Sequence, residues 1–186
     1  MNDTALIIVD LQNDYFPGGA MELTGIEQAC RNAARILKHF RSSGRPVHHI
    51  RHVSIHEGAT FFLPGTQGSE IHAAVSPLEG ESVMIKHFPN SFLGTELEKT
   101  LKGQSVKRLI ICGAMSHMCI DATTRAAFDL GFGCTAAHDA CATRDLEFLG
   151  KTNPAAQVHT AFMAALNGIY ARVISSEEII SSSMAR

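Results

Sequence analysis

Short apolar segments alternate with longer segments of helical periodicity along most of this chain. Ala5 to Val9 is an unbroken apolar run, which is typical of a strand that is covered on both faces. Similar runs recur along the chain, and we expect six strands, over 5–9, 46–50, 82–85, 107–112, 133–137 and 171–174. The pattern therefore predicts a sheet buried in the middle of the molecule.

Apolar residues three or four positions apart separate most of these strands, as they do in helices with one buried face. Two helices should begin at Thr24–Glu27 and Thr95–Glu98, because both tetrapeptides have the Thr-x-x-Glu form of a capping box. Further helices are expected over 122–130 and 155–166. Strand and helix thus alternate along the chain.

Residues 52–80 interrupt this alternation with a long stretch rich in glycine and proline. Loops of this length in compact domains are usually functional. The stretch includes the apolar pair Phe61-Phe62, and an exposed pair of phenylalanines would need a cover. We therefore expect a lid over a site or a contact with another subunit here.

The order of the elements predicts the fold class. Alternating strands and helices indicate an α/β protein with three α/β/α layers and a mainly parallel, six-stranded, Rossmann-like doubly wound sheet. We detect no repeat and no linker, so we expect a single domain over residues 1–186. In such sheets ligands bind beyond the carboxyl ends of the strands, and that edge is where chemistry should be sought.

Composition narrows the possible partners. The chain has 186 residues, 45% of them hydrophobic, and a formal net charge of −2 with acidic and basic residues interspersed. This gives no footprint for nucleic acid and no basic amphipathic helix for a membrane surface. Five scattered cysteines without a C-x-x-C pair, and no targeting segment, favour a reducing cytoplasm without disulfides. A small molecule is the expected partner.

Three reactive side chains follow predicted strands. Asp10 comes directly after the first strand, Lys86 after the third, and Cys119 in a turn between the fourth strand and a helix. The topology therefore places a carboxylate, an ammonium and a thiol on the same edge of the sheet, as nucleophilic catalysis requires. The helix N-terminus after Cys119 should favour its thiolate.

Three sequence blocks resemble the isochorismatase-like cysteine hydrolase superfamily, which includes nicotinamidases, carbamoylsarcosine amidases and streptothricin hydrolases. They are Ile8–Phe16 (IVDLQNDYF), Lys86 with Asn90–Leu97 (NSFLGTEL), and Gly113–Cys119 (GAMSHMC). The first and third blocks are specific as a pair, and the resemblance extends over nearly the whole chain.

The resemblance implies an Asp10–Lys86–Cys119 triad and a cis peptide bond between Ala114 and Met115. It further implies an oxyanion hole formed by the backbone N–H groups of Met115 and Cys119. Such an enzyme would hydrolyse a C–N bond of an amide, ureide or lactam through a thioester and need no cofactor. A homodimer or homotetramer is implied by family habit alone.

Nicotinamidases of this superfamily carry an Asp-x-His metal motif after the second strand. This chain has His52 and Ser54 at those positions, which argues against nicotinamide as a substrate and against a metal. His48, His49 and His56 lie nearby, but adjacent residues of a strand point to opposite faces. We therefore expect a metal-independent site.

Further residues are candidates for contact with the substrate. Gln12 lies in the first of the three blocks, and Phe16, Phe62 and Phe92 could form an apolar wall, although core packing explains phenylalanines at least as well. His117 lies two residues before Cys119 and could face the cleft. Asp139 also follows a predicted strand, and we expect it to cap a helix or form a salt bridge.

Two readings from other classes remain open. A catalytically silent binding or scaffold protein would keep the fold, but it would have no need of the three reactive side chains. A thiol redox sensor would need a resolving cysteine near Cys119, for which Cys112 and Cys141 are candidates. The substrate cannot be predicted from the sequence, because pocket walls come from loops.

Overall fold

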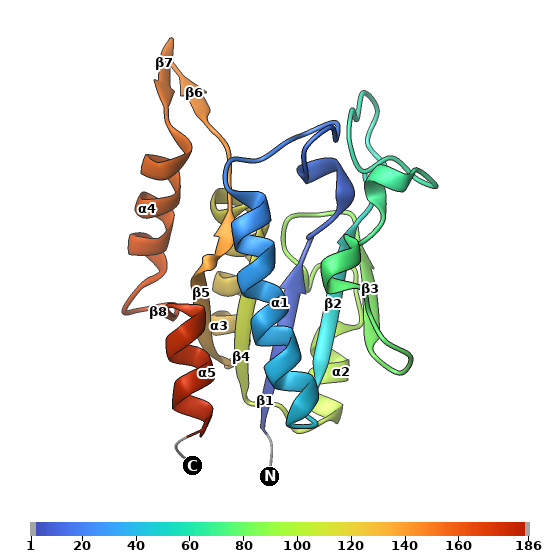
Figure 1. Ribbon diagram of the computed structural model, residues 1–186, viewed down its shortest axis with the longest axis vertical. Coiled ribbons are helices and arrows are strands. Elements are labelled where there is room, and N and C mark those ends of the chain that lie inside the picture. Colours follow the sequence, from blue (N-terminus) through green and yellow to red (C-terminus); the bar gives the residue numbers. More distant parts are fainter. Residues whose placement is uncertain (1–2, 185–186) are drawn as a thin grey trace.

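A six-stranded sheet forms the centre of the computed structural model, which describes residues 3–184 (Figure 1). The strand order is β3-β2-β1-β4-β5-β8, and neighbouring strands are parallel throughout. The strands are β1 (Thr4–Val9), β2 (Val47–His52), β3 (Ser82–Lys86), β4 (Arg108–Ala114), β5 (Gly133–Ala142) and β8 (Arg172–Ile174). All six predicted strands are confirmed.

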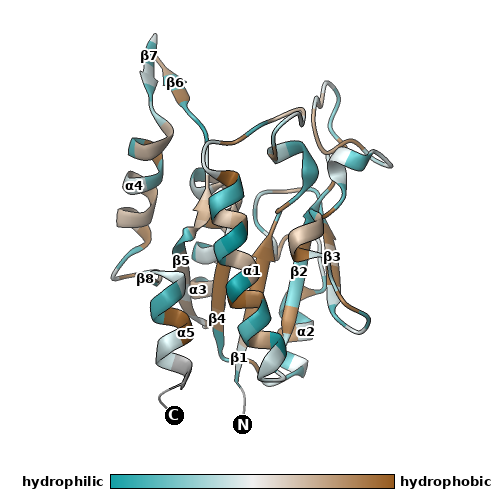
Figure 2. Cartoon of the chain, viewed as in Figure 1, coloured by the Kyte–Doolittle hydropathy of each residue, from teal (hydrophilic) through white to brown (hydrophobic). Residues whose placement is uncertain are grey.

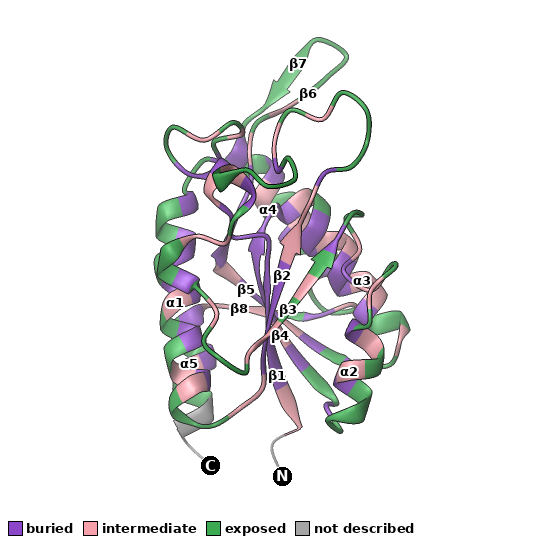
Figure 3. Cartoon of the chain, turned by 90° about the vertical axis from the view of Figure 1, so that its right-hand side faces the viewer, coloured by how far each residue is buried: buried purple, intermediate pink, exposed green. Residues whose placement is uncertain are grey.

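Helices cover both faces of the sheet, which confirms the three-layer α/β/α architecture. One layer holds α1 (Ile26–Ser42) and α5 (Ser176–Met184), and the other holds α2 (Leu97–Gly103), α3 (Asp121–Asp129) and α4 (Ala155–Leu166). Figure 3 shows α1 and α5 on one side of the sheet and α2 and α3 on the other. A small hairpin of β6 (Leu146–Phe148) and β7 (Lys151–Asn153) stands beyond the carboxyl end of the sheet.

The core lies on both sides of β1, whose hydrophobic colour is continuous in Figure 2. Leu6 and Ile8 pack in the cluster on the α1 face, whereas Ile7 and Val9 pack in the cluster on the opposite face. Successive side chains of a strand alternate between faces, so an unbroken apolar run is what a strand covered on both sides requires.

Both helices that were predicted to start with capping boxes start differently. Gly25 precedes α1 in a left-handed conformation with φ 73°, and no side chain caps the helix. The backbone N–H of Thr24 instead donates to the carbonyl of Thr143, at 3.1 Å. At α2 the hydroxyl of Thr95 accepts from the N–H of Leu97 rather than from that of Glu98. The capping-box predictions are therefore wrong in detail, although the helices exist.

Asp14 organises the long connection between β2 and β3, which contains the short 3₁₀ turns η2 (Gln67–Ser69) and η3 (Ala73–Val75). Asp14 lies in the 3₁₀ turn η1 (Asn13–Tyr15), and its carboxylate accepts the N–H of Phe62 at 2.6 Å. A Cβ atom at Gly68 would lie 2.0 Å from Oδ1 of Asp14, so a larger residue here would have to displace the carboxylate. Phe62 is fully buried against Tyr15. Phe61 is partly buried against the same cluster, so the pair is covered within the chain, and a lid or a subunit contact at this segment stays a prediction.

Glu81 joins α1 to the strand β2. Its carboxylate accepts two hydrogen bonds from Arg41, at 2.7 and 2.8 Å, and one from His49, at 2.9 Å. Burial by itself raises the pKa of Glu81, but these bonds and one from the N–H of Leu78 outweigh it and hold the pKa at about 2. The network contributes stability as long as Glu81 is ionised.

Glu81→Gln should lower the free energy of unfolding at pH 7 by about 2 kcal/mol. Because the folded-state pKa lies below the ordinary value of 4.5, the contribution is complete above pH 4.5 and is lost as the pH falls toward about 2. Urea unfolding at pH 7 and pH 3 measures both effects. Glu79→Gln, at an exposed neighbour, is the control, and equal losses in the two variants would contradict the prediction.

Within residues 3–184, no helix combines the length and apolar character needed to cross a bilayer.

Candidate active site

Four adjacent strands deliver one side chain each to the carboxyl edge of the sheet. Lys86 is the last residue of β3, His52 the last of β2, Asp10 follows β1, and Cys119 lies in the turn after β4. His52 and Lys86 are direct partners in the strand register. Asp10 has φ 52°, a left-handed conformation that aspartate tolerates better than most residues. The sheet order therefore brings together the three residues singled out in the sequence, and adds His52.

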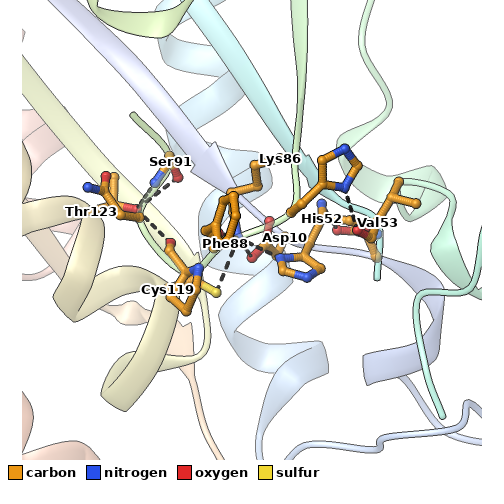
Figure 4. Close-up of polar contacts among 12 residues, drawn as sticks. Asp10, His52, Val53, Lys86, Phe88, Ser91, Cys119 and Thr123 are labelled. Carbon is orange, nitrogen blue, oxygen red and sulfur yellow. Dashed lines mark hydrogen bonds and ion pairs between the residues drawn. The ribbon is translucent and has the colours of Figure 1, made fainter. Parts of the chain in front are cut away.

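The ammonium group of Lys86 lies at the centre of this group (Figure 4). Its Nζ is 2.7 Å from Oδ2 of Asp10 and 3.2 Å from Sγ of Cys119. It also donates to Nδ1 of His52 at 3.0 Å and to the carbonyl of Phe88 at 3.1 Å. Asp10, Lys86 and Cys119 are 0%, 1% and 3% exposed. The charges thus interact in a region of low dielectric, where pairing is strong.

Burial, not the helix N-terminus, dominates the protonation of Cys119. Burial raises the pKa of this thiol above its ordinary value, the charge of Asp10 raises it further, and Lys86 lowers it in opposition. The stabilisation of the thiolate that the sequence led us to expect is therefore outweighed by burial. In the free site the sulfur carries its proton, so a base is needed to generate the nucleophile.

Lys86 remains charged in the same surroundings. Burial by itself lowers its pKa, but the charges of Asp10 and Cys119 and the hydrogen bonds to them shift it upward overall. Oδ1 of Asp10 is buried and accepts no hydrogen bond from any residue between 3 and 184. The carboxylate thus presents one oxygen to Lys86 and one that is available for a proton.

The turn that carries Cys119 has an unusual backbone. The Ala114–Met115 peptide bond is cis, at the position where the sequence resemblance places one. A π-helical turn, Ser116–Ile120, follows, and α3 begins at Asp121. Upstream, Gly113 has φ 127°, and a Cβ atom there would lie 1.9 Å from the carbonyl oxygen of Val9. This glycine lets β4 approach β1 closely just before the turn.

Comparison with known sequences identifies the family. The sequence model of the isochorismatase domain matches residues 4–178, nearly the whole chain. This chain belongs to the isochorismatase family. The uncharacterized isochorismatase family protein YddQ of Bacillus subtilis is 52% identical over 177 residues, which cover 95% of this chain and 98% of YddQ.

Other family members are similar in structure or carry a named activity. The crystal structure of an isochorismatase-family hydrolase from Oleispira antarctica matches this chain with a TM-score of 0.93 and 54% identity, and the match covers 97% of each chain. A streptothricin hydrolase of Streptomyces noursei is 33% identical over 144 residues, covering 76% of this chain and 50% of that enzyme. The chain is thus an isochorismatase-family hydrolase.

The buried amide of Gln12 is committed to the protein itself. Nε2 donates to the carbonyls of His52 and Ser69, at 2.8 and 2.7 Å, and Oε1 accepts the N–H of His52 at 2.7 Å. All its strong hydrogen-bonding capacity apart from one lone pair is used. Gln12 therefore joins the end of β2 to the long connection, and its contact with a substrate stays a prediction.

The three phenylalanines expected to line the site pack elsewhere in the protein. Phe16 stacks on His72 with ring centroids 3.7 Å apart, and Phe62 is fully buried beside Tyr15. Phe92 is partly buried against Phe132. Core packing thus accounts for all three positions, and contact of these rings with a substrate stays a prediction.

His117 lies within the Cys119 turn, and Arg144 lies near it. Nδ1 of His117 is 2.5 Å from the hydroxyl of Thr143, and its Nε2 is buried without a hydrogen-bond partner within residues 3–184. Burial lowers the pKa of His117, and the charge of Arg144 lowers it further. Nε of Arg144 is likewise buried without a described partner. Burial raises the pKa of Tyr15, the charges of Cys119 and Asp10 raise it further, and the charge of Arg144 lowers it, so all three groups lie near this ring.

The sequence analysis missed two residues at this edge of the sheet. It did not predict that His52 would contact Lys86, and it did not consider Arg144. The predicted strands ended at residues 50 and 137, whereas β2 and β5 continue to His52 and Ala142. With the correct ends, the strand-end rule points to both residues. Asp139 instead lies within β5 and caps α5, accepting the N–H and the hydroxyl of Ser176 at 2.7 Å each, so its expected structural role is confirmed.

Asp10, His52 and Cys119 form a group whose ligand atoms lie within 4.8 Å of one another, close enough to surround a cation. The Nζ of Lys86 already lies within 3.2 Å of each of these side chains. A metal ion here would have to displace a buried ammonium group. The donor set thus fits the ammonium of Lys86 rather than a metal ion.

Proposed function

We propose that this chain is a cysteine hydrolase that cleaves a C–N bond of a small amide, ureide or lactam. One observation carries the proposal: Nζ of Lys86 lies between Oδ2 of Asp10 and Sγ of Cys119, at 2.7 and 3.2 Å. A thiol, a carboxylate and a cation in contact are the parts that nucleophilic catalysis needs. Similarity to a streptothricin hydrolase supports hydrolysis as the reaction type.

The first half of the reaction forms a thioester. Oδ1 of Asp10 takes the proton of the Cys119 thiol, while Lys86 stabilises the charge that moves to sulfur. The thiolate attacks the carbonyl carbon, the C–N bond breaks, and ammonia or an amine leaves with the proton from Asp10. Net charge within the site stays constant, which suits a group shielded from water.

The second half regenerates the enzyme. Asp10 removes a proton from water, the resulting hydroxide attacks the thioester, and Cys119 leaves as a thiolate that recovers its proton. In both halves negative charge develops on the carbonyl oxygen of the substrate. We assign its stabilisation to the backbone N–H groups of Met115 and Cys119, which lie on the same turn, and each such donor is worth about 3–4 kcal/mol in other enzymes.

The side chains beside the turn favour a substrate that carries an anion. Buried polar nitrogens without a partner are costly, and Arg144 and His117 each present one, Nε and Nε2. A substrate carboxylate beside the turn would accept from Nε of Arg144, and from Nε2 of His117 in the tautomer that carries its proton there. We therefore infer that the substrate is a small amide or ureide of a carboxylic acid.

Arg144→Gln should raise KM for carboxylate-bearing amides about 10- to 100-fold and change kcat little, because a charge-assisted hydrogen bond is lost in ground and transition states alike. Steady-state kinetics with a carboxylate-bearing substrate and its neutral analogue measure the effect. Arg172→Gln, at an exposed arginine, is the matched control. If both substrates lose equally in Arg144→Gln, the anion contact is wrong.

A screen tests the proposed function directly. Small primary amides, ureido acids, carbamoyl compounds and lactams are incubated with the protein, and ammonia release or ring opening is followed, with Cys119→Ala as the control. The scaffold alternative predicts no turnover of any compound. The redox alternative would have to use Cys141, because Cys112 packs on the opposite face of the sheet from Cys119, whereas Cys141 lies in the same buried cluster as Cys119.

A cytoplasmic location and a homo-oligomeric state remain predictions from composition and family habit.

A further inference from the structure

The contacts of Lys86 exceed its hydrogen-bonding capacity. Four acceptors lie within 3.2 Å of Nζ: Oδ2 of Asp10, Nδ1 of His52, the carbonyl of Phe88 and Sγ of Cys119. An ammonium group has three N–H bonds. Either two acceptors therefore share one hydrogen, or one acceptor receives a hydrogen bond from Lys86 only after its own charge has changed.

The form of His52 follows from this contact. An ammonium has no lone pair, so Lys86 donates and Nδ1 of His52 accepts. The ring is therefore neutral, with its proton on Nε2. Its backbone is fixed by Gln12, which bonds both the N–H and the carbonyl of His52. Charged or titratable groups that face the ring are Lys86, Asp10, His56 and His87.

We propose that His52 is a positioning residue that acts through Lys86. Neutral His52 and the carbonyl of Phe88 hold two N–H bonds of the ammonium, so that the third points at the gap between Asp10 and Cys119. In the resting site this hydrogen goes to the carboxylate. When the S–H bond breaks and the proton forms an O–H bond on Oδ1 of Asp10, the same hydrogen turns to the thiolate.

The arrangement keeps Lys86 stationary while charge moves beside it. Without an acceptor at Nδ1, the free N–H would form its bond with Asp10 or with water, and the ammonium would move away from sulfur. Nδ1 faces Lys86 rather than Cys119, so His52 is not the base that removes the thiol proton. This inference rests on the proposed function, because it concerns the same thiol.

Three variants separate the acceptor at Nδ1 from other roles of the ring. His52→Leu fills similar space without an acceptor, whereas His52→Asn can place an amide oxygen near the position of Nδ1. His56→Leu is the control at an exposed histidine four residues away. If His52→Leu fails to fold, as judged by circular dichroism, His52→Gln replaces it, because its amide reaches the position of Nε2 instead.

The measurement is the rate of Cys119 alkylation by iodoacetamide between pH 5 and pH 10, followed by mass spectrometry. We expect His52→Leu to slow alkylation at pH 7 about 10- to 100-fold and to move the profile to higher pH. His52→Asn should recover most of the rate, and His56→Leu should match the unmodified protein. A His52→Leu profile equal to that of the unmodified protein, or equal loss in the leucine and asparagine variants, would overturn the inference.

The same experiment distinguishes failure of this inference from failure of the proposed function. If Cys119 of the unmodified protein reacts no faster than Cys30, a buried cysteine outside the site, then the cysteine hydrolase assignment itself fails. If Cys119 reacts selectively but the variants do not differ, only the role of His52 fails. Once a substrate is known, the role assigned here predicts a lower kcat with little change in KM for His52→Leu.

Discussion

Cys119→Ala should lower the rate of C–N hydrolysis by a factor on the order of 10⁵, which is the scale of losing the nucleophile in other covalent hydrolases. The residual rate would come from binding and from the oxyanion donors, which the substitution leaves in place. Because the side chain is small and packs at the end of the cluster on the α2 face, the variant should remain folded. Steady-state kinetics and circular dichroism test the two parts.

Cys134→Ala is a suitable control for this prediction. Cys134 is also buried, and burial raises its pKa to about 12, but it lies near the amino end of β5, away from Asp10 and Lys86. Its replacement should leave the rate within a few-fold of the unmodified protein. Retention of most activity in Cys119→Ala would exclude a thioester and require another nucleophile.

Lys86→Met should lower the free energy of unfolding by about 3–5 kcal/mol, in addition to removing activity. The methionine fills similar space, but it leaves the fully buried Asp10 carboxylate without the cation that lies 2.7 Å away. The pKa of Lys86 is raised above its ordinary value of 10.5, so its contribution is complete below that pH and is lost only under more alkaline conditions. Urea unfolding at pH 7 measures the loss.

The double variant Asp10→Asn/Lys86→Met provides the matched comparison. Replacing both partners removes the unpaired charge, so the double variant should be more stable than Lys86→Met alone. Asparagine is the right replacement because residue 10 has φ 52°, which asparagine tolerates. If the double variant is the less stable of the two, the electrostatic account of the Lys86 loss fails.

Local sequence predicted the sheet well, because strands covered on both faces must be apolar along their length. It failed at strand ends, where polarity does not separate a strand from a loop. Arg51 and His52 extend β2 because they pair with Ile85 and Lys86 of β3, and those partners come from another segment. The Ser-rich helix α5 was missed because its apolar residues before Met184 are the adjacent pair Ile179 and Ile180, which shows no helical periodicity.

The three reactive residues could be predicted because each follows an apolar run in a parallel sheet. The protonation states of these residues could not be predicted from the sequence. A turn before a helix suggested a thiolate at Cys119, but depth of burial decides the pKa, and burial depends on everything packed above the turn. Likewise, Gln12 lies in a block that resembles the family's motif, yet the sequence does not tell that its amide spans to His52 and Ser69.

The strand register limits where this protein can change its length. His52 and Lys86 face each other as paired residues of β2 and β3, and their side chains emerge from the same face of the sheet. One residue inserted or deleted within either strand would rotate the final side chain to the opposite face, while the apolar layers could still form. Length variation compatible with chemistry is therefore restricted to the connections, above all residues 53–81, between two strands whose own lengths cannot vary.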